Sequence, residues 1–234
     1  MRSAALALIS SFIAAAAPAA AQTRPAPVVV ELFTSQGCSA CVEANAYLGE
    51  VAEREGVLPL SFSVDYWDYL GWRDTLARPE HTARQRAYLR RLNLRRLYTP
   101  QVVVDGRDAA AGFEHERIDG FIRSNTEPAW ASPEITLSAD ARRVWIGSGR
   151  TRGAADVWLV RFDPRGRTVT VDRGENRGRE VRVVNPVVAV QRLGPWRGRP
   201  LSLRLPASPD DDLRTAVLLQ QPDGGPILSA AVDD

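Results

Sequence analysis

Lysine is missing from this sequence altogether, and several other residue types are scarce. Every basic residue is arginine, and 30 of them nearly balance 28 acidic residues, so the net charge is only +2. We attribute the arginine bias to genomic composition. A charge so close to neutral does not favour the electrostatic attraction on which nucleic-acid binding depends. We therefore expect no nucleic acid among the partners, and a composition of 44% apolar and 25% charged residues predicts a globular protein.

Long apolar runs are absent beyond the N-terminus. Met1 and Arg2 form a short basic start, residues 6–17 are apolar, and the alanines at 19–21 are side chains that a signal peptidase accepts. The apolar run is too short to be a stable membrane span. We predict a signal peptide over residues 1–21, a periplasmic or secreted protein, and no stable membrane insertion after cleavage. An uncleaved N-terminal anchor is the alternative.

Cysteine is almost absent, and the two that occur, Cys38 and Cys41, belong to one CxxC unit. Exported proteins meet an oxidising compartment, where structural disulfides are common. A structural disulfide stabilises mainly by closing a long loop in the unfolded chain, whereas this pair closes almost nothing. Chemistry is therefore a better explanation of the pair than structural stabilisation.

The residues around the CxxC unit alternate between strand and helix patterns. Residues 28–33 form a continuous apolar run typical of a buried strand, and residues 58–64 alternate strictly between apolar and polar. Between them, residues 39–54 place apolar side chains at three- and four-residue steps, which predicts a helix. Strand, helix and strand in this order predict a βαβ unit with a parallel pair.

The next segment completes an α/β domain. We predict a helix over 79–93, which begins at Pro79, strands over 101–105 and 108–111 joined by a tight turn at Asp105 and Gly106, and a closing helix over 114–125. This order is that of a thioredoxin-like domain with a helical insert, which we assign to residues 22–127.

The remainder, residues 128–234, has strand and turn patterns and no convincing helix. Pro128 and Pro133 bracket an expected linker, and turn-forming residues at 163–166 and 222–225 suggest hairpins. Short, regularly spaced strands predict an all-β, sandwich-like domain. The expected strands are residues 135–138, 144–147, 157–162, 168–171, 181–192, 201–205, 216–220 and 227–232.

The position of Cys38 and Cys41 makes the CxxC unit a candidate redox site. Cys38 follows a buried strand and opens a helix, where unpaired N–H groups and the helix dipole stabilise a thiolate. A thiolate of this kind attacks disulfides. Cys41, one turn into the helix, is placed to resolve the mixed disulfide formed at Cys38. These are the expected roles of the two cysteines in catalysis.

Three further residues are candidates for the same site. Pro100 lies at the start of a strand, and a cis Thr99–Pro100 bond would expose the Thr99 backbone to an extended substrate; a trans proline that merely begins the strand is the alternative. Glu31 precedes Cys38 by seven residues in an apolar strand. It is either a buried carboxyl that exchanges protons with the inner cysteine or a residue that faces solvent or pairs with an arginine.

Two other groups of residues have a structural and a functional interpretation. Tyr66, Trp67, Tyr69 and Trp72 either pack in the core, which we favour, or line a peptide groove. A set of arginines on the inserted helix and just after it is better explained as a solvated face than as a docking surface. These arginines are Arg84, Arg86, Arg90, Arg91, Arg95 and Arg96.

Several of these motifs together resemble a known family of secreted thioredoxin-like proteins, the domain of unknown function 1223. The similar segments are residues 30–41, 64–68, 70–72, 82–86, 98–101 and, in the second half, 173–176. The resemblance covers nearly all of the chain beyond the signal and implies a thioredoxin fold followed by a sandwich-like domain, with Cys38, Cys41 and Pro100 at active-site positions. Val42 and Glu43 stand where prolines usually follow the second cysteine.

Our first hypothesis is a thiol–disulfide oxidoreductase that acts on protein disulfides. Its partners would be protein thiol or disulfide substrates and a redox partner protein, and it would need no cofactor or metal beyond the redox-active Cys38–Cys41 disulfide. The second hypothesis is a binding or scaffold protein with a vestigial CxxC unit. A copper (metal) chaperone that uses both thiolates is the third. The residues between the cysteines carry neither charge nor ring and do not indicate a direction of electron flow.

Overall fold

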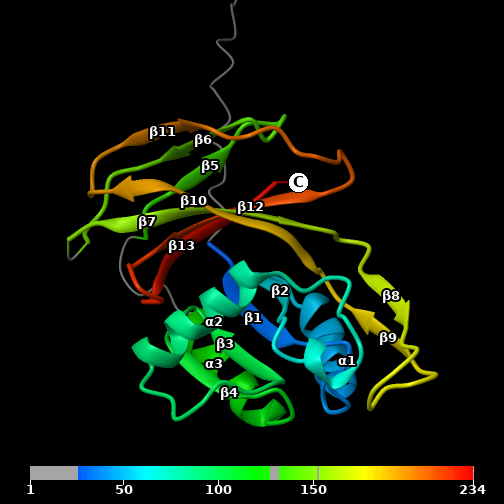
Figure 1. Cartoon of the computed structure of the whole chain (residues 1–234). Coiled ribbons are helices and arrows are strands. Elements are labelled where there is room, and N and C mark those ends of the chain that lie inside the picture. Colours follow the sequence, from blue (N-terminus) through cyan, green and yellow to red (C-terminus); the bar gives the residue numbers. More distant parts are fainter. Residues whose placement is uncertain (1–25, 127–131, 152, 234) are drawn as a thin grey trace, which may run out of the picture.

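The computed structural model describes residues 26–126, 132–151 and 153–233. The expected signal peptide and Pro128 lie outside these residues. The described chain is a mixed α/β structure, in which helices accompany the first half and strands make up the second (Figure 1). The mixed α/β class predicted from the sequence is confirmed.

The first half builds a four-stranded sheet with the order β2-β1-β3-β4. β1 and β2 are parallel, as the βαβ pattern predicted, whereas β3 is antiparallel to both β1 and β4. The Asp105–Gly106 turn between β3 and β4 has positive φ at both residues, as in a turn of type I′, and Arg107 N closes it with a hydrogen bond of 2.9 Å to Val104 O. Because Val104 pairs with Asp108, the connection has three residues. The elements are β1 (Val28–Thr34), α1 (Cys41–Ala52), β2 (Val57–Ser63), η1 (Asp68–Leu70), α2 (Pro79–Arg91), β3 (Gln101–Val104), β4 (Asp108–Ala111) and α3 (His115–Thr126).

Strand alternation divides this sheet into two buried faces. Val28, Val30 and Leu32 of β1 point toward α1 and α3 and form one core with them. Val29 and Phe33 point the other way, into a second core that includes Tyr88 of α2 and residues of the second half. The two halves of the chain therefore share a hydrophobic core.

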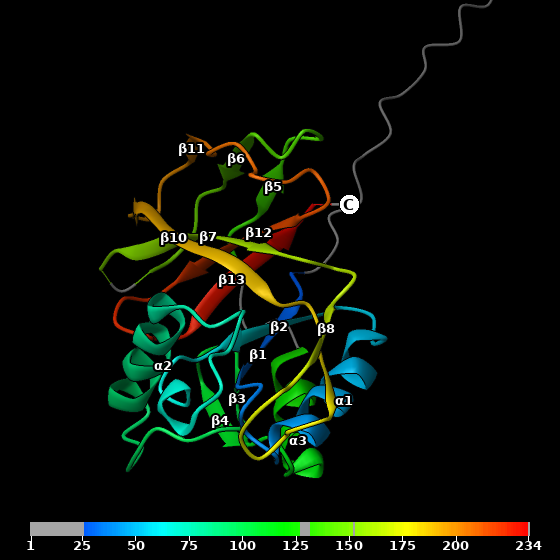
Figure 2. The ribbon, with the colours of Figure 1, turned by 45° about the vertical axis from the view of Figure 1, so that its right-hand side comes forward.

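The second half forms three further sheets, with orders β10-β7-β12-β13, β11-β6-β5 and β8-β9. The β10-β7-β12-β13 sheet contributes Val160 and Leu218 to the shared core, while Val157 and Leu219 face the β11-β6-β5 sheet. The helices α1 and α3, the first sheet and the two larger sheets of the second half thus follow one another as layers, with α2 on the face of the first sheet that is turned toward the second half (Figures 1 and 2). The strands are β5 (Ile135–Leu137), β6 (Arg143–Ile146), β7 (Ala155–Phe162), β8 (Arg167–Thr170), β9 (Glu180–Val183), β10 (Val187–Trp196), β11 (Leu201–Arg204), β12 (Arg214–Gln220) and β13 (Ile227–Val232).

Two expectations for this half are wrong. Residues 181–192 are not one strand: β9 and β10 are separate, because Asn185 adopts φ 41° and Pro186 cannot donate to a ladder. Residues 163–166 form a turn with a hydrogen bond from Gly166 N to Asp163 O, but β7 and β8 on either side do not pair. The hairpin between β12 and β13 is confirmed.

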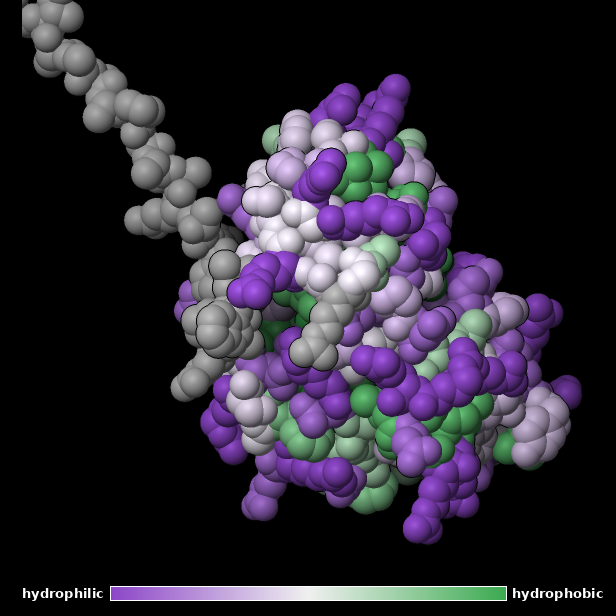
Figure 3. All heavy atoms as spheres, turned by 90° about the vertical axis from the view of Figure 1, so that its left-hand side faces the viewer, coloured by the Kyte–Doolittle hydropathy of each residue, from purple (hydrophilic) through white to green (hydrophobic). Residues whose placement is uncertain are grey.

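Hydrophilic side chains cover much of the outer surface on the face shown in Figure 3. On this face, apolar side chains are interrupted by hydrophilic ones. Among the described residues, no helix has the length and apolarity to cross a membrane.

Candidate functional site

Cys38 and Cys41 form a disulfide at the point where β1 gives way to α1. Their Cα atoms are 5.3 Å apart, and the intervening turn is held by hydrogen bonds of 3.1 Å from Cys38 N to Ser35 O and from Cys41 N to Cys38 O. Because α1 begins at Cys41, the disulfide lies at the helix N-terminus, where backbone N–H groups lack helical partners. The sequence placed the pair between a strand and a helix, but it predicted that Cys38 opens the helix and that Cys41 lies one turn inside it; instead Cys38 lies in the preceding turn and Cys41 is the first helical residue.

Both cysteines are buried: Cys38 is 2% exposed and Cys41 is fully covered. Ser39 and Ala40 between them are exposed. Thiol–disulfide exchange requires a thiolate to approach one sulfur. In this conformation the two residues between the cysteines are exposed to solvent, whereas Cys38 and Cys41 themselves are almost fully covered.

Gln36 holds the loop that leads into Cys38. Its side-chain oxygen accepts hydrogen bonds from Trp72 Nε1 at 3.0 Å and from Thr75 N at 3.3 Å, and its side-chain nitrogen donates to Thr75 Oγ1. Its backbone N donates to Asp74 Oδ2 at 2.7 Å. Burial raises the pKa of Asp74 to about 6, although hydrogen bonds from Gln36 and Leu76 oppose the shift. Neither Gln36 nor Asp74 was among the residues singled out from the sequence.

Pro100 lies beside the first turns of α1. The Thr99–Pro100 bond is cis, as expected, and the Pro100 carbonyl accepts a hydrogen bond from Gly112 N at 3.0 Å. A Cβ added to Gly112 would lie 2.8 Å from Pro100 Cβ and 2.7 Å from Ala44 Cβ. Glycine is therefore the residue that lets Pro100 and the helix approach each other here.

Glu31 is buried with two partners. Its carboxylate accepts a hydrogen bond from Arg84 Nε at 2.6 Å and another from the Tyr88 hydroxyl, and both groups belong to α2. Glu31 shares its sheet face with Val29 and Phe33, opposite the face on which α1 packs. A role for Glu31 in proton exchange stays a prediction, and the observed partners correspond to the alternative of a pair with an arginine.

Arg84 departs from the expected solvated face of α2. Its side chain is 6% exposed, and its guanidinium lies over the rings of Phe62, Tyr88 and Trp158. A buried arginine needs a counter-charge, and Glu31 supplies it. The aromatic segment after β2 is divided between core and surface: Tyr66 and Trp67 pack against the shared core, whereas Tyr69 is 83% exposed.

A loop of the second half reaches the cysteines. Residues 171–179, which connect β8 and β9 and which we name the cover loop, lie beside the start of α1 (Figure 2). Asn176 Nδ2 donates to Gln36 O at 2.9 Å and to Cys38 O at 3.0 Å, and Glu175 accepts a hydrogen bond from Ser39 N at 3.0 Å. The only sequence signal for these two residues was their place in the family-like segment 173–176.

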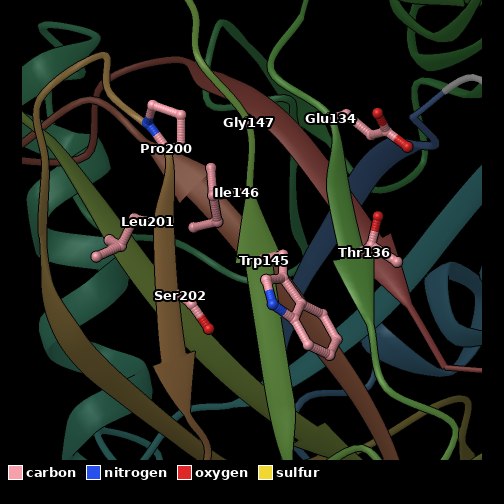
Figure 4. Close-up of a pocket in the computed structure, with 8 residues that line it drawn as sticks. All are labelled: Glu134, Thr136, Trp145, Ile146, Gly147, Pro200, Leu201 and Ser202. Carbon is pink, nitrogen blue, oxygen red and sulfur yellow. The ribbon is translucent and has the colours of Figure 1, made fainter.

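A hollow on the outer β11-β6-β5 sheet is a separate feature (Figure 4). Trp145 of β6 extends beside Thr136 of β5, and Glu134 is the one ionisable residue in the lining. The hollow contains neither cysteine nor histidine. Elsewhere in the described parts of the chain, no group of three or more His, Cys, Asp or Glu residues is placed to hold a metal ion.

The fold and the site together define a class: mixed α/β proteins with a CxxC disulfide at a helix N-terminus and a cis-proline beside that helix. A family model described as protein of unknown function (DUF1223) matches residues 29–220, and the chain belongs to this family.

Two solved structures are similar to this chain. A protein of Agrobacterium tumefaciens, determined by X-ray crystallography in a structural-genomics programme, is 34% identical with a TM-score of 0.72, and the match covers 89% of this chain and 94% of that one. HBP35 of Porphyromonas gingivalis is 14% identical with a TM-score of 0.61, over 89% of this chain and 75% of that one, and so shares the fold alone. No curated protein matches the chain.

Proposed function

We propose that this protein is a thiol–disulfide oxidoreductase that acts on protein thiols and disulfides through Cys38 and Cys41, in the periplasm or outside the cell. The observation that carries the proposal is the Cys38–Cys41 disulfide at the N-terminus of α1. A disulfide between residues three apart contributes little to stability, and its position favours a thiolate at Cys38.

The proposed N-terminal unit is thioredoxin-like. Two features support this assignment: the order β1-α1-β2 followed by β3-β4-α3, with α2 inserted, and the position of Pro100 at the start of β3 and next to α1. In such a unit, the Thr99 backbone would orient an extended substrate against Cys38. Glu31 is not required in this scheme, since its carboxylate is engaged by Arg84.

The reaction is a two-electron exchange. A substrate thiolate attacks the Cys38 sulfur, the bond between Cys38 and Cys41 breaks, and Cys41 leaves as a thiolate that takes up a proton. A second substrate thiol then attacks the substrate sulfur of the mixed disulfide, which forms a substrate disulfide and releases reduced Cys38. The substrate loses two electrons and two protons, and the cysteine pair gains them. The reverse sequence reduces a substrate disulfide.

The test is a titration of the purified protein against glutathione, with thiols alkylated and counted by mass. A reversible two-electron transition supports the proposal, and a potential near about −120 mV would mark an oxidant, one near about −270 mV a reductant. A pair that shows no reversible exchange would leave the binding or scaffold protein as the better account.

Single serine variants separate the two cysteines. Cys38→Ser should abolish exchange, because the attacked sulfur is gone, whereas Cys41→Ser should accumulate mixed disulfides at Cys38 that cannot be resolved. The measurement is capture of disulfide-linked partners on a non-reducing gel, with the double-serine variant as control. Full turnover by either single variant contradicts the proposal.

A further inference from the structure

The cover loop is attached to the redox site by a small number of polar contacts at its tip. Asn176 is fully buried, although the residues on both sides of it are exposed. Its side-chain amide donates to the carbonyls of Gln36 and Cys38, which flank Gly37. Glu175 accepts from Ser39 N on the other side of Cys38. The tip therefore contacts the chain immediately before and after the cysteine that the proposed function requires to react.

The base of the hairpin is held differently from the tip. Val171, Val181 and Val183 form a small apolar cluster, against which Val42 of α1 and Trp72 pack. At the tip, Glu175 to Arg177 lie between Gly174 and Gly178, which have φ values of 78° and 75°. A Cβ at Gly178 would meet no atom within 4 Å. β9 and the first residue of the cover loop, Val171, are thus anchored by apolar packing, whereas the tip is bounded by two glycines and held by hydrogen bonds.

We propose that the cover loop is a gate over the Cys38–Cys41 disulfide, and that Asn176 and Glu175 are the residues that keep it closed. The inference rests on the proposed function and adds a regulation of access to it. Cys38 is 2% exposed with the loop in place. A partner thiolate reaches the Cys38 sulfur only after the tip lifts away from Gln36 and Cys38, while Val171 and β9 stay anchored.

The gate sets the rate of exchange through the fraction of molecules that are open. When opening and closing are faster than the chemical step, the observed rate is the intrinsic rate multiplied by the open fraction. Loss of the two Asn176 hydrogen bonds raises that fraction, because each buried hydrogen bond contributes to the closed state alone. We therefore class Asn176 and Glu175 as positioning residues rather than catalytic ones, since their contacts are to the backbone around Cys38.

The experiment measures reduction of the oxidised full chain by excess dithiothreitol, with alkylation and mass analysis at timed intervals. Dithiothreitol supplies two thiols and becomes a cyclic disulfide as Cys38 and Cys41 are reduced. We expect Asn176→Ala to be reduced about tenfold faster than the wild type and Glu175→Ala roughly threefold faster, the scale of one or two lost hydrogen bonds.

A matched control is Asn185→Gly. Asn185 Nδ2 donates to Pro59 O at 2.9 Å, so it also joins the second half to the first through an asparagine amide, but at β2 and away from the cysteines. Glycine is chosen because the φ of Asn185 is 41°. Its rate of reduction should stay within about twofold of wild type, which separates gate opening from general loosening between the halves.

The outcomes for the gate and for the proposed function can be distinguished. An Asn176→Ala rate within twofold of wild type overturns the gate, even if the glutathione titration is reversible. Faster reduction of Asn176→Ala with no reversible exchange against glutathione supports the gate and removes the proposed function. If Asn176→Ala fails to fold, Glu175→Ala decides alone, because Glu175 is exposed and its removal leaves the core intact; an unchanged rate then overturns the gate.

Discussion

Replacement of Glu31 by glutamine tests how the structure uses its buried carboxylate. Glu31 is fully buried, and its ion pair with Arg84 measures 2.6 Å. Glu31→Gln preserves size and one acceptor oxygen but leaves the buried guanidinium without a counter-charge. Loss of one partner of a buried pair costs about 3–5 kcal/mol, and we expect about 3 kcal/mol because the amide oxygen still accepts from Arg84 Nε.

The assay is urea unfolding of the oxidised protein. A loss of about 3 kcal/mol should lower the midpoint by about 1 M or more. Asp212→Asn is the control, since its pair with Arg165 has the same 2.6 Å separation but side chains 63% and 56% exposed. That exposed pair should contribute less than about 1 kcal/mol. A double variant, Glu31→Leu with Arg84→Met, should recover most of the loss, because it removes both buried charges.

The rate of thiol exchange gives the result that would refute this reasoning. Since Glu31 projects from the sheet face opposite α1, Glu31→Gln should leave the exchange rate of the folded protein within about twofold of wild type. If stability instead changes by less than about 1 kcal/mol while exchange slows at least tenfold, Glu31 acts on the inner cysteine, as one of the two interpretations of the sequence holds.

Two further substitutions test a buried carboxyl beside the beginning of β1, at the end of the strand away from the cysteines, and the close contact between Pro100 and α1. Burial raises the pKa of Asp105 from 3.8 to about 7 in the folded protein. Between these two pH values the folded state binds more protons than the unfolded state, so the free energy of unfolding falls as the pH rises from about 4 to about 7. Asp105→Asn keeps an oxygen that accepts the hydrogen bond from Val29 N. It should raise the free energy of unfolding at pH 8 by at least about 1 kcal/mol and have little effect near pH 4. Thermal unfolding at both pH values measures this, and an equal gain at both would contradict the prediction. Gly112→Ala should cost about 1–3 kcal/mol and slow exchange, because the added methyl would separate Pro100 from α1; urea unfolding and dithiothreitol kinetics measure the two effects, and wild-type values in both would show that the close approach is unimportant.

Local patterns determined much of the first half. Three local features depend on residues that are neighbours in the chain: the apolar period of α1, the alternation in β2 and the Asp105–Gly106 turn. They can therefore be predicted without knowledge of the fold. For the same reason the sequence placed the cysteine pair between a strand and a helix, and Pro100 directly before a strand, although the helix begins at Cys41 rather than near Cys38. Asn185 and Pro186 were a local signal too, but we predicted a continuous strand through them over residues 181–192.

Only the tertiary structure revealed the contacts between segments that are far apart in the sequence. Alternation within β1 could not say which face Glu31 would occupy, and its partner Arg84 is 53 residues away. The side chain of Asn176 donates a hydrogen bond to the carbonyl of Cys38, which is 138 residues away in the sequence, and no periodic pattern predicts such a contact. The sequence by itself thus determined where the cysteine pair lies on a strand and a helix, because turns and amphipathic periods are local. Only the packing of the second half on the first decided that Asn176 and Glu175 hydrogen-bond to the backbone around Cys38, because such contacts depend on the arrangement of whole sheets.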